Sequence, residues 1–327
     1  MLNIVNKSLK DYKFIDLFCG IGGFHLALAS FGAKCVFASD INQRTQKVYE
    51  NNFNILPFGD LRNIKNIDIP KHDILCAGFP CQPFSISGNQ EGLDHESGKL
   101  FYEIIRIAKF HQPKVIFLEN VKNLRNHDQG NTLNTILSEL NKVNYDVFFE
   151  VLNASDFGVP QARKRIYIVC FRKDLKVTNF NFPAILENTV SLDSVLLPIN
   201  DNALVIEQKY ELLDGLNIKS LDRRKLIRIG KTGLGRQGER IYSPLGQAVT
   251  LSSQGGGPAG KTGMYLIDGN IRKLHKRECA RVMGFPDSFI LPDSTAECYK
   301  QFGNSVVVDV LQKILNNIAL ILEGEKI

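Results

Sequence analysis

Residues 12–24 read YKFIDLFCGIGGF and contain the pattern that decides the fold. An apolar run leads into a glycine-rich turn at 19–23, and residues 26–29 continue with helical character. A strand, a glycine turn and a helix in this order begin the nucleotide-binding half of a doubly wound α/β sheet. The glycine spacing is G-x-G-G, and His25 occupies the place of a third dinucleotide-motif glycine, so the hydride-carrier fingerprint is absent.

The same alternation continues through the first half of the chain. Further strands are predicted at 34–39, 55–58, 73–77, 113–118, 145–152 and 166–171, and helices are predicted up to about 52 and at 100–110 and 132–142. In open parallel sheets, ligands bind outside the carboxyl ends of the strands. Five residues with groups suited to binding or catalysis stand at or after the ends of these strands: Gly20, Asp40, Asp60, Cys81 and Glu119. We therefore expect them to converge on one crevice.

The acids and the cysteine each have a second interpretation. Asp40 stands twenty positions after Gly20, where a carboxylate can accept hydrogen bonds from a ribose diol. Each acid, Asp40 or Asp60, could instead be a surface residue or a helix cap, and for Asp60 taken alone this is the favoured interpretation. Cys81 lies in the octapeptide GFPCQPFS, where Pro80 and Pro83 restrict the backbone, and a free cysteine can also be a small buried hydrophobe.

From about 180 to 274 the α/β alternation gives way to short apolar pieces and glycine-rich turns. Between Lys219 and Arg281 the chain has fourteen lysines and arginines and four acids, a net charge of +10, although the whole chain carries only +6. Concentrated positive charge among glycines is typical of a surface that binds phosphate backbones. The alternative is a solvated basic face without a partner.

Composition and cysteine usage limit the class of protein. The 327 residues are 44% hydrophobic, no apolar run is predicted to span a bilayer, and the start lacks a signal-peptide core, so a cytoplasmic protein is expected. The seven cysteines are scattered without a C-x-x-C pair, which predicts neither a disulfide framework nor a metal site. A last helix is predicted from Gly303-Asn304-Ser305 and is expected to return to the α/β domain.

Six stretches together carry a family resemblance. Residues 16–24, 78–85, 119–121, 161–165, 277–286 and 303–306 read DLFCGIGGF, GFPCQPFS, ENV, QARKR, RECARVMGFP and GNSV. In this order they resemble the motifs of the cytosine-5 DNA methyltransferase family. The resemblance implies a doubly wound, mostly parallel sheet with a smaller, mostly β and loop target-recognition domain. The implied boundaries are 1–185 and 284–327 for the catalytic and cofactor-binding domain and 186–283 for target recognition.

The resemblance also implies a catalytic set. A thiolate adding to C6 of cytosine makes C5 nucleophilic, which is the role implied for Cys81. Negative charge on the ring then requires a proton or hydrogen bond at N3, the role implied for Glu119, whose pKa burial would raise. Arg163 and Arg165 are assigned to the base carbonyl oxygen, to Glu119 and to the adjacent phosphate, where a guanidinium binds bidentately.

The implied methyl donor is S-adenosylmethionine, with S-adenosylhomocysteine as product. Its expected contacts are Phe18, Gly20, Gly22, Gly23, Asp40, Ile41, Asp60, Pro80, Leu100 and Asn304. Asp40 would bind the ribose hydroxyls and Asp60 the adenine amine. Ile41 stands where the family has a tryptophan, and the chain contains no Trp, so the adenine would pack on an aliphatic surface.

The implied partner is double-stranded DNA, with the target cytosine flipped out of the duplex. The expected DNA-binding residues are Ser85, Ser87, Arg228, Gln237, Arg240, Thr250, Ser252, Gly255, Gly256 and Gly257. The recognition region, with QGERIYS at 237–243 and GGG at 255–257, is similar to that of a GCGC-specific member, although Leu234, Gln254 and residues 258–260 depart from it. A monomer is expected, and a cognate restriction endonuclease would act on the same site.

Three other functions are weighed against this one. The tRNA-methylating branch of the family shares the cysteine and the glutamate, but its Cys-Phe-Thr tripeptide is absent from the target region. A non-catalytic DNA-binding regulator would lack Cys81 or Glu119, and both are present. A nicotinamide oxidoreductase is disfavoured by the glycine spacing.

Overall fold

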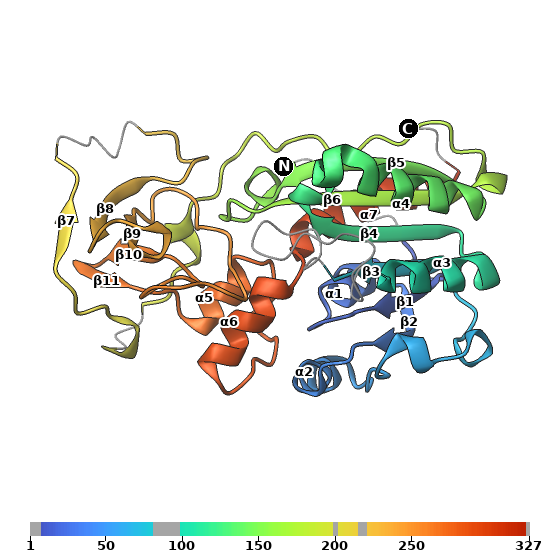
Figure 1. Ribbon diagram of the computed structural model, residues 1–327, viewed down its shortest axis with the longest axis horizontal. Helices are drawn as coiled ribbons and strands as arrows, with labels where there is room; N and C mark the ends of the chain where they lie inside the picture. The colour runs from blue at the N-terminus through green and yellow to red at the C-terminus, as the bar shows by residue number, and fades with distance from the viewer. Residues whose placement is uncertain (1–7, 81–98, 199–201, 215–220, 325–327) are drawn as a thin grey trace. The chain divides into compact units, whose positions relative to one another are not determined.

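The computed structural model describes residues 8–80, 99–198, 202–214 and 221–324 (Figure 1). The chain divides into two compact units. The first unit comprises Met1–Leu152, Lys164–Ala184 and Val310–Ile327, and the second comprises Asn153–Arg163 and Ile185–Asp309. The chain therefore passes from one unit to the other four times.

The first unit is built on a six-stranded sheet in the order β2-β1-β3-β4-β6-β5. Its strands are β1 Lys13–Leu17, β2 Lys34–Ser39, β3 Ile74–Gly78, β4 Val115–Val121, β5 Tyr145–Asn153 and β6 Lys164–Arg172. The pairs β1/β2, β1/β3 and β3/β4 are parallel, whereas β6 runs antiparallel to β4. This topology confirms the doubly wound, mostly parallel sheet.

Helices pack on both faces of this sheet because its strands alternate their side chains. The helices are α1 Gly23–Ser30, α2 Gln43–Phe53, α3 Leu100–His111, α4 Asn131–Lys142 and α7 Val308–Leu322. Ile15 and Leu17 join the core that α3 and α4 cover. Phe14 faces the other way and meets His25 of α1 edge to face at 5.4 Å. Asp16, which lies between Ile15 and Leu17 in β1, places a carboxylate in the interior of the sheet.

The second unit contains a five-stranded sheet in the order β11-β10-β9-β8-β7 and two helices. The elements are β7 Tyr210–Leu212, β8 Arg228–Thr232, β9 Arg240–Tyr242, β10 Met264–Ile267, β11 Asn270–Arg272, α5 Lys276–Arg281 and α6 Thr295–Asn304. A small apolar core includes Ile229, Ile241 and Met264. The unit agrees with the expected mixture of short strands and loops.

Two predicted elements differ from the structure. Residues 55–58 form no strand and make a single bridge between Phe58 and Ser39. The reason is Pro57, which has no N–H group for a ladder. The helix predicted from Gly303-Asn304-Ser305 corresponds to α7, which begins at Val308, and α6, which ends at Asn304, is an additional helix that was not predicted. Ser294 caps α6 by accepting a hydrogen bond from the Glu297 N–H.

The C-terminal part of the chain, which contains α6 and α7, is divided between the two units and is largely buried. By contacts, residues 284–309 group with the second unit, whereas the sequence assigns them to the catalytic domain. Thr295–Leu322 is long and apolar enough to cross a membrane, but over half of its apolar window is buried in the protein. This burial is the pattern of a core helix.

Candidate active site

The carboxyl end of β4 carries the carboxylate predicted to act on the base. Glu119 is 7% exposed and pairs in register with Gly78 of β3 and with Tyr167 of β6. Its Oε1 lies 3.2 Å from Nε of Arg165, two residues earlier on β6. Because β6 runs antiparallel to β4, Arg165 reaches the strand end from the opposite direction. The structure thus brings these two predicted residues together.

Asn120 extends the same strand end toward the predicted nucleophile. Its side-chain amide donates a hydrogen bond of 3.2 Å to the carbonyl of Phe79, and its Oδ1 accepts from the Val121 N–H. Phe79 is buried and stands two residues before Cys81. Cys81 lies outside the described residues, as do the predicted DNA-binding residues Ser85 and Ser87. Asn120 therefore fixes the start of the segment that carries Cys81.

The six other cysteines are poor nucleophiles. Burial raises the pKa of Cys35 and of Cys298 to about 12. Burial also raises the pKa of each remaining thiol, at Cys19, Cys76, Cys170 and Cys279. A thiol is reactive only as the thiolate, which these pKa values disfavour at neutral pH. By elimination, Cys81 is the candidate left for covalent chemistry.

The glycine turn after β1 and the acid after β2 form one hydrogen-bonded unit. The Asp40 carboxylate accepts bonds from the Gly20 N–H at 2.9 Å and from the Asn42 N–H at 2.8 Å. Burial raises the pKa of Asp40, and these two bonds oppose the rise. Gly22, at the amino terminus of α1, has φ +87° and leaves no room for a Cβ, which would meet the Phe53 ring at 2.1 Å. Glycine is therefore required at this position.

Asp16 is a buried acid that the sequence prediction did not include. Its side chain is 0% exposed, and neither oxygen has a hydrogen-bond partner among the described residues. Burial raises its pKa well above the usual range, and the neighbouring Asp40 raises it further, against smaller opposing effects of the His25 backbone and the Tyr49 hydroxyl. The signal was available, because a lone charge interrupts the apolar run Phe-Ile-Asp-Leu-Phe.

The other predicted cofactor residues have different environments. Asp60 caps a short 3-10 helix and forms an ion pair with Arg62 at 2.6 Å, and hydrogen bonds from Arg62 lower its pKa. Ile41 is 70% exposed. The remaining predicted contacts in the first unit are Phe18 and Gly23 at the turn, Pro80 after β3, and Leu100 at the start of α3. Asn304, in the second unit, is exposed at the end of α6.

The second unit brings the two predicted DNA-reading loops into contact. A Cβ on Gly238 would lie 2.1 Å from the Gly256 carbonyl oxygen, so the loops pack backbone to backbone. Gln237 is exposed beside this contact, and Arg240 begins β9 opposite Lys231 of β8. The other predicted residues here are Arg228 on β8, Gly255 and Gly257 of the glycine run, and Thr250 and Ser252 on a preceding segment.

Arg163 does not share the position of Arg165. It belongs to the second unit and is 2% exposed, and its guanidinium donates to the backbone carbonyls of Leu251, Gly303 and Ser305. The predicted contact of Arg163 with the base carbonyl or Glu119 therefore stays a prediction.

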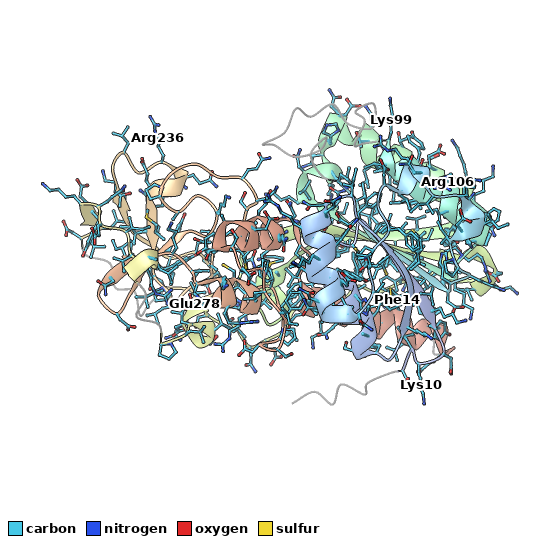
Figure 2. All side chains as sticks on the ribbon, turned by 90° about the horizontal axis from the view of Figure 1, so that it is seen from below. Lys10, Phe14, Lys99, Arg106, Arg236 and Glu278 are labelled. Carbon is cyan, nitrogen blue, oxygen red and sulfur yellow. The ribbon has the colours of Figure 1, made fainter. Side chains whose placement is uncertain are left out.

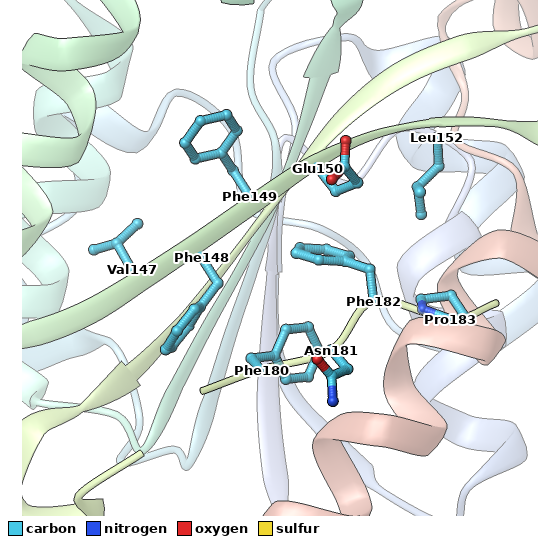
Figure 3. Close-up of a pocket in the computed structure, with 9 residues that line it drawn as sticks. All are labelled: Val147, Phe148, Phe149, Glu150, Leu152, Phe180, Asn181, Phe182 and Pro183. Carbon is cyan, nitrogen blue, oxygen red and sulfur yellow. The ribbon is translucent and has the colours of Figure 1, made fainter. Parts of the chain in front are cut away.

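A pocket of about 560 Å³ lies in the first unit away from these strand ends (Figure 3). Phe148, Phe180 and Phe182 gather in it beside β5, and Glu150 is its one ionisable lining residue. It has no pair of acid and base groups and no nucleophile, so it does not resemble a catalytic centre. Among the described residues, no cluster of three or more His, Cys, Asp or Glu could hold a metal ion.

Comparison with known proteins agrees with this arrangement. The family model for C-5 cytosine-specific DNA methylases matches residues 12–320. The chain therefore belongs to the C-5 cytosine-specific DNA methylase family, and it is a DNA (cytosine-5) methyltransferase. Members of this family use S-adenosylmethionine.

The chain is similar to several individual DNA methyltransferases. The chain is 50% identical to the type II methyltransferase M.HhaI of Haemophilus parahaemolyticus over 97% of both chains. It is 40% identical to M.HpaII of Haemophilus parainfluenzae over 94% of this chain and 89% of that one. A putative DNA modification methyltransferase encoded within an E. coli prophage shares the fold, with a TM-score of 0.70 at 20% identity over 96% and 100% of the two chains.

Proposed function

We propose that this enzyme flips a cytosine out of duplex DNA, adds the Cys81 thiolate to its C6 and transfers the methyl group to its C5. Loss of the C5 proton to water and elimination of the thiolate would then release the methylated base. The observation that supports this most strongly is Glu119 at the end of β4, next to Arg165 and to the Asn120 bond that anchors the segment leading to Cys81. Glu119 would donate to N3 of the base while the thiolate adds. Arg165 would orient Glu119 and bind the base carbonyl oxygen.

The residues around the glycine turn fit S-adenosylmethionine. Asp16 is an orphaned buried carboxylate, which the ammonium group of a bound amino acid would satisfy. Gly20 leaves open space where a Cβ would stand. Asp40 has lone pairs left for ribose hydroxyls, and Ile41 offers an exposed aliphatic surface to the adenine. When bound, the cofactor supplies an electrophilic methyl group.

We further propose that the recognition site is GCGC, with the inner cytosine as target. The glycine contact between the loops at 238 and 256 would present Gln237 and Arg240 together, so that Arg240 reads base edges and Gln237 fills the space of the flipped base. The 50% identity to M.HhaI supports this choice. The enzyme would act as a cytoplasmic monomer, beside a restriction endonuclease for the same site.

A covalent trap tests the chemistry. Purified enzyme is incubated with S-adenosylmethionine and a duplex carrying 5-fluorocytosine at the inner position of one GCGC site. We expect a denaturant-resistant protein–DNA adduct, because fluorine at C5 prevents release of the thiol. Cys81→Ser should form none, whereas Cys298→Ser, at a buried thiol, should form it normally. An adduct with the Cys81 variant would refute the assignment of the nucleophile.

Sequencing tests the recognition site. Plasmid DNA methylated by the pure enzyme is read by bisulfite or single-molecule sequencing, with tRNA as a parallel substrate. We expect methylation at GCGC alone. Methylation at another tetranucleotide would show that Gln254 and residues 258–260 alter specificity, and methylation of tRNA alone would favour the other branch of the family.

A further inference from the structure

The short segment from Gln161 to Arg163 belongs to the second unit, and its two long side chains are buried, at 0% exposure for Gln161 and 2% for Arg163. The Arg163 guanidinium donates to three backbone carbonyls, those of Leu251 at 3.0 Å, Gly303 at 3.1 Å and Ser305 at 2.6 Å. Leu251 belongs to the segment that we expect to read DNA, and Gly303 and Ser305 flank Asn304. One planar side chain thus bridges two segments that are about fifty residues apart in sequence.

Gln161 reinforces the same arrangement. Its Oε1 accepts from the Leu251 N–H at 3.2 Å, and its Nε2 donates to the Val282 carbonyl at 2.9 Å. Next to it, the Ala162 N–H donates to the Ala248 carbonyl at 2.9 Å. Both the N–H and the carbonyl of Leu251 are therefore held by side chains of the Gln161–Arg163 segment, which fixes the backbone between Thr250 and Ser252.

The two bridged segments also touch directly. A Cβ on Gly303 would lie 2.2 Å from the Ser253 nitrogen and 2.3 Å from the Ser252 carbonyl carbon. No side chain fits at that distance, so the turn carrying Asn304 packs against the segment 250–253 with no space between the backbones. Displacement of either segment must move the other or break these contacts.

We propose that Arg163 is a positioning residue that couples the DNA-reading segment 250–253 to the turn carrying Asn304. The inference rests on the proposed function and on the expectation from sequence that Thr250 and Ser252 contact DNA and Asn304 contacts the cofactor. Both ligands would then favour the same arrangement of the bridged segments, so each increases affinity for the other. Arginine is needed because lysine cannot reach three carbonyls in one plane.

Calorimetry tests the coupling. The affinity for S-adenosylhomocysteine is measured with and without a GCGC duplex, and the affinity for the duplex with and without S-adenosylhomocysteine. In the wild-type enzyme, each ligand should increase the affinity for the other by the same factor, in the range of roughly 5- to 150-fold typical of coupled sites. In Arg163→Lys this factor should fall to about twofold or less, with reciprocal loss in the two titrations. Arg172→Lys, at a half-buried arginine on β6, should keep the wild-type factor.

Other results overturn the inference in distinguishable ways. If Arg163 contacts the DNA itself, Arg163→Lys weakens duplex binding equally with and without S-adenosylhomocysteine, and the factor is unchanged. Gly303→Ala loosens the same contact from the other side and provides the test should Arg163→Lys fail to fold; an unchanged factor there also refutes coupling. A wild-type enzyme that methylates GCGC without any coupling refutes the inference alone, and one that binds neither ligand refutes the proposed function too.

Discussion

Two glutamate–arginine pairs in this enzyme have opposite characters. Glu278 of the second unit is labelled in Figure 2. It forms two bonds of 2.8 Å with Arg272, with side chains 0% and 6% exposed, and it also accepts from the N–H groups of His275 and Leu197. In the first unit, Oε1 of Glu119 lies 3.2 Å from Nε of Arg165, and the two side chains are 9% and 15% exposed.

The first pair has the burial and bonding of a structural pair, whereas we propose that the second pair acts on the substrate. Glu278 has its oxygens occupied from three directions, so a new ligand would have to break existing bonds. In the proposed function Glu119 turns toward a base, and its longer, more exposed contact with Arg165 is consistent with that role. The four predictions below test this contrast, beginning with the largest expected effect.

Glu119→Gln should lower the rate of methyl transfer by about 10²–10⁴-fold, because glutamine cannot transfer a proton to the base. Thermal unfolding should change little, since the side chain keeps its shape and its strand. Single-turnover methylation of a GCGC duplex measures the rate. Glu150→Gln, at an exposed carboxylate on β5, is the matched control and should react at the wild-type rate. Equal rates for both variants would contradict the assigned role.

Glu278→Ala should lower the free energy of unfolding by about 3–5 kcal/mol, because it leaves the Arg272 charge buried without its partner. Urea denaturation followed by circular dichroism measures this loss. The folded fraction should still form the covalent adduct with 5-fluorocytosine at a near-normal rate. A specific loss of adduct formation in fully folded Glu278→Ala would show that the contrast between the two pairs is wrong.

Asp16 is a third buried carboxylate, and unlike Glu278 and Glu119 it has no arginine ion-pair partner among the described residues. Its raised pKa means that the folded state binds more protons than the unfolded state above about pH 4, so stability falls as pH rises toward the folded pKa. Asp16→Asn cannot ionise, so unfolding measured from pH 4 to 8 should show a flatter dependence and greater stability than wild type at pH 8. It should also bind S-adenosylhomocysteine more weakly. A wild-type curve that does not fall over this range would refute the raised pKa.

Asp287→Asn should have the smallest effect. Asp287 forms a 2.6 Å ion pair with Arg281, but it is 58% exposed, and water and salt screen such pairs. The urea midpoint and the methylation rate should both stay within experimental error of wild type. A clear loss of stability would show that short distance, and not burial, decides which ion pairs matter here.

Much of the fold could be predicted from local pattern. The strands at 13–17, 34–39 and 74–78 lie within or beside the predicted strands, because each is a short, mostly apolar run. The prediction failed at 55–58, where Pro57 removes a donor, and at α6 Thr295–Asn304, where the buried Cys298, Tyr299 and Phe302 lie at helical spacing among polar residues. Sequence alone also overlooked the Ser294 and Glu297 capping signal.

The site was predictable where it depends on motifs and not where it depends on tertiary contacts. Glu119 and Arg165 stand in short motifs that resemblance identifies, and the structure pairs them. The Asn120 bond to Phe79 requires the sheet to be assembled first, whereas the lone charge of Asp16 in an apolar run was visible in the sequence and was overlooked. The carbonyls that bind Arg163 come from segments near 251 and 304, which no local pattern connects.

The four crossings of the chain between its units have a consequence for protein engineering. A chimaera that exchanged only Ile185–Asp309 for the matching part of a relative would leave Asn153–Arg163 behind, although that segment belongs to the exchanged unit. The graft would then inherit a foreign Gln161 and Arg163 to hold its own recognition loop. Transplanting target specificity therefore calls for two cassettes, one of eleven residues and one of about 125, moved together.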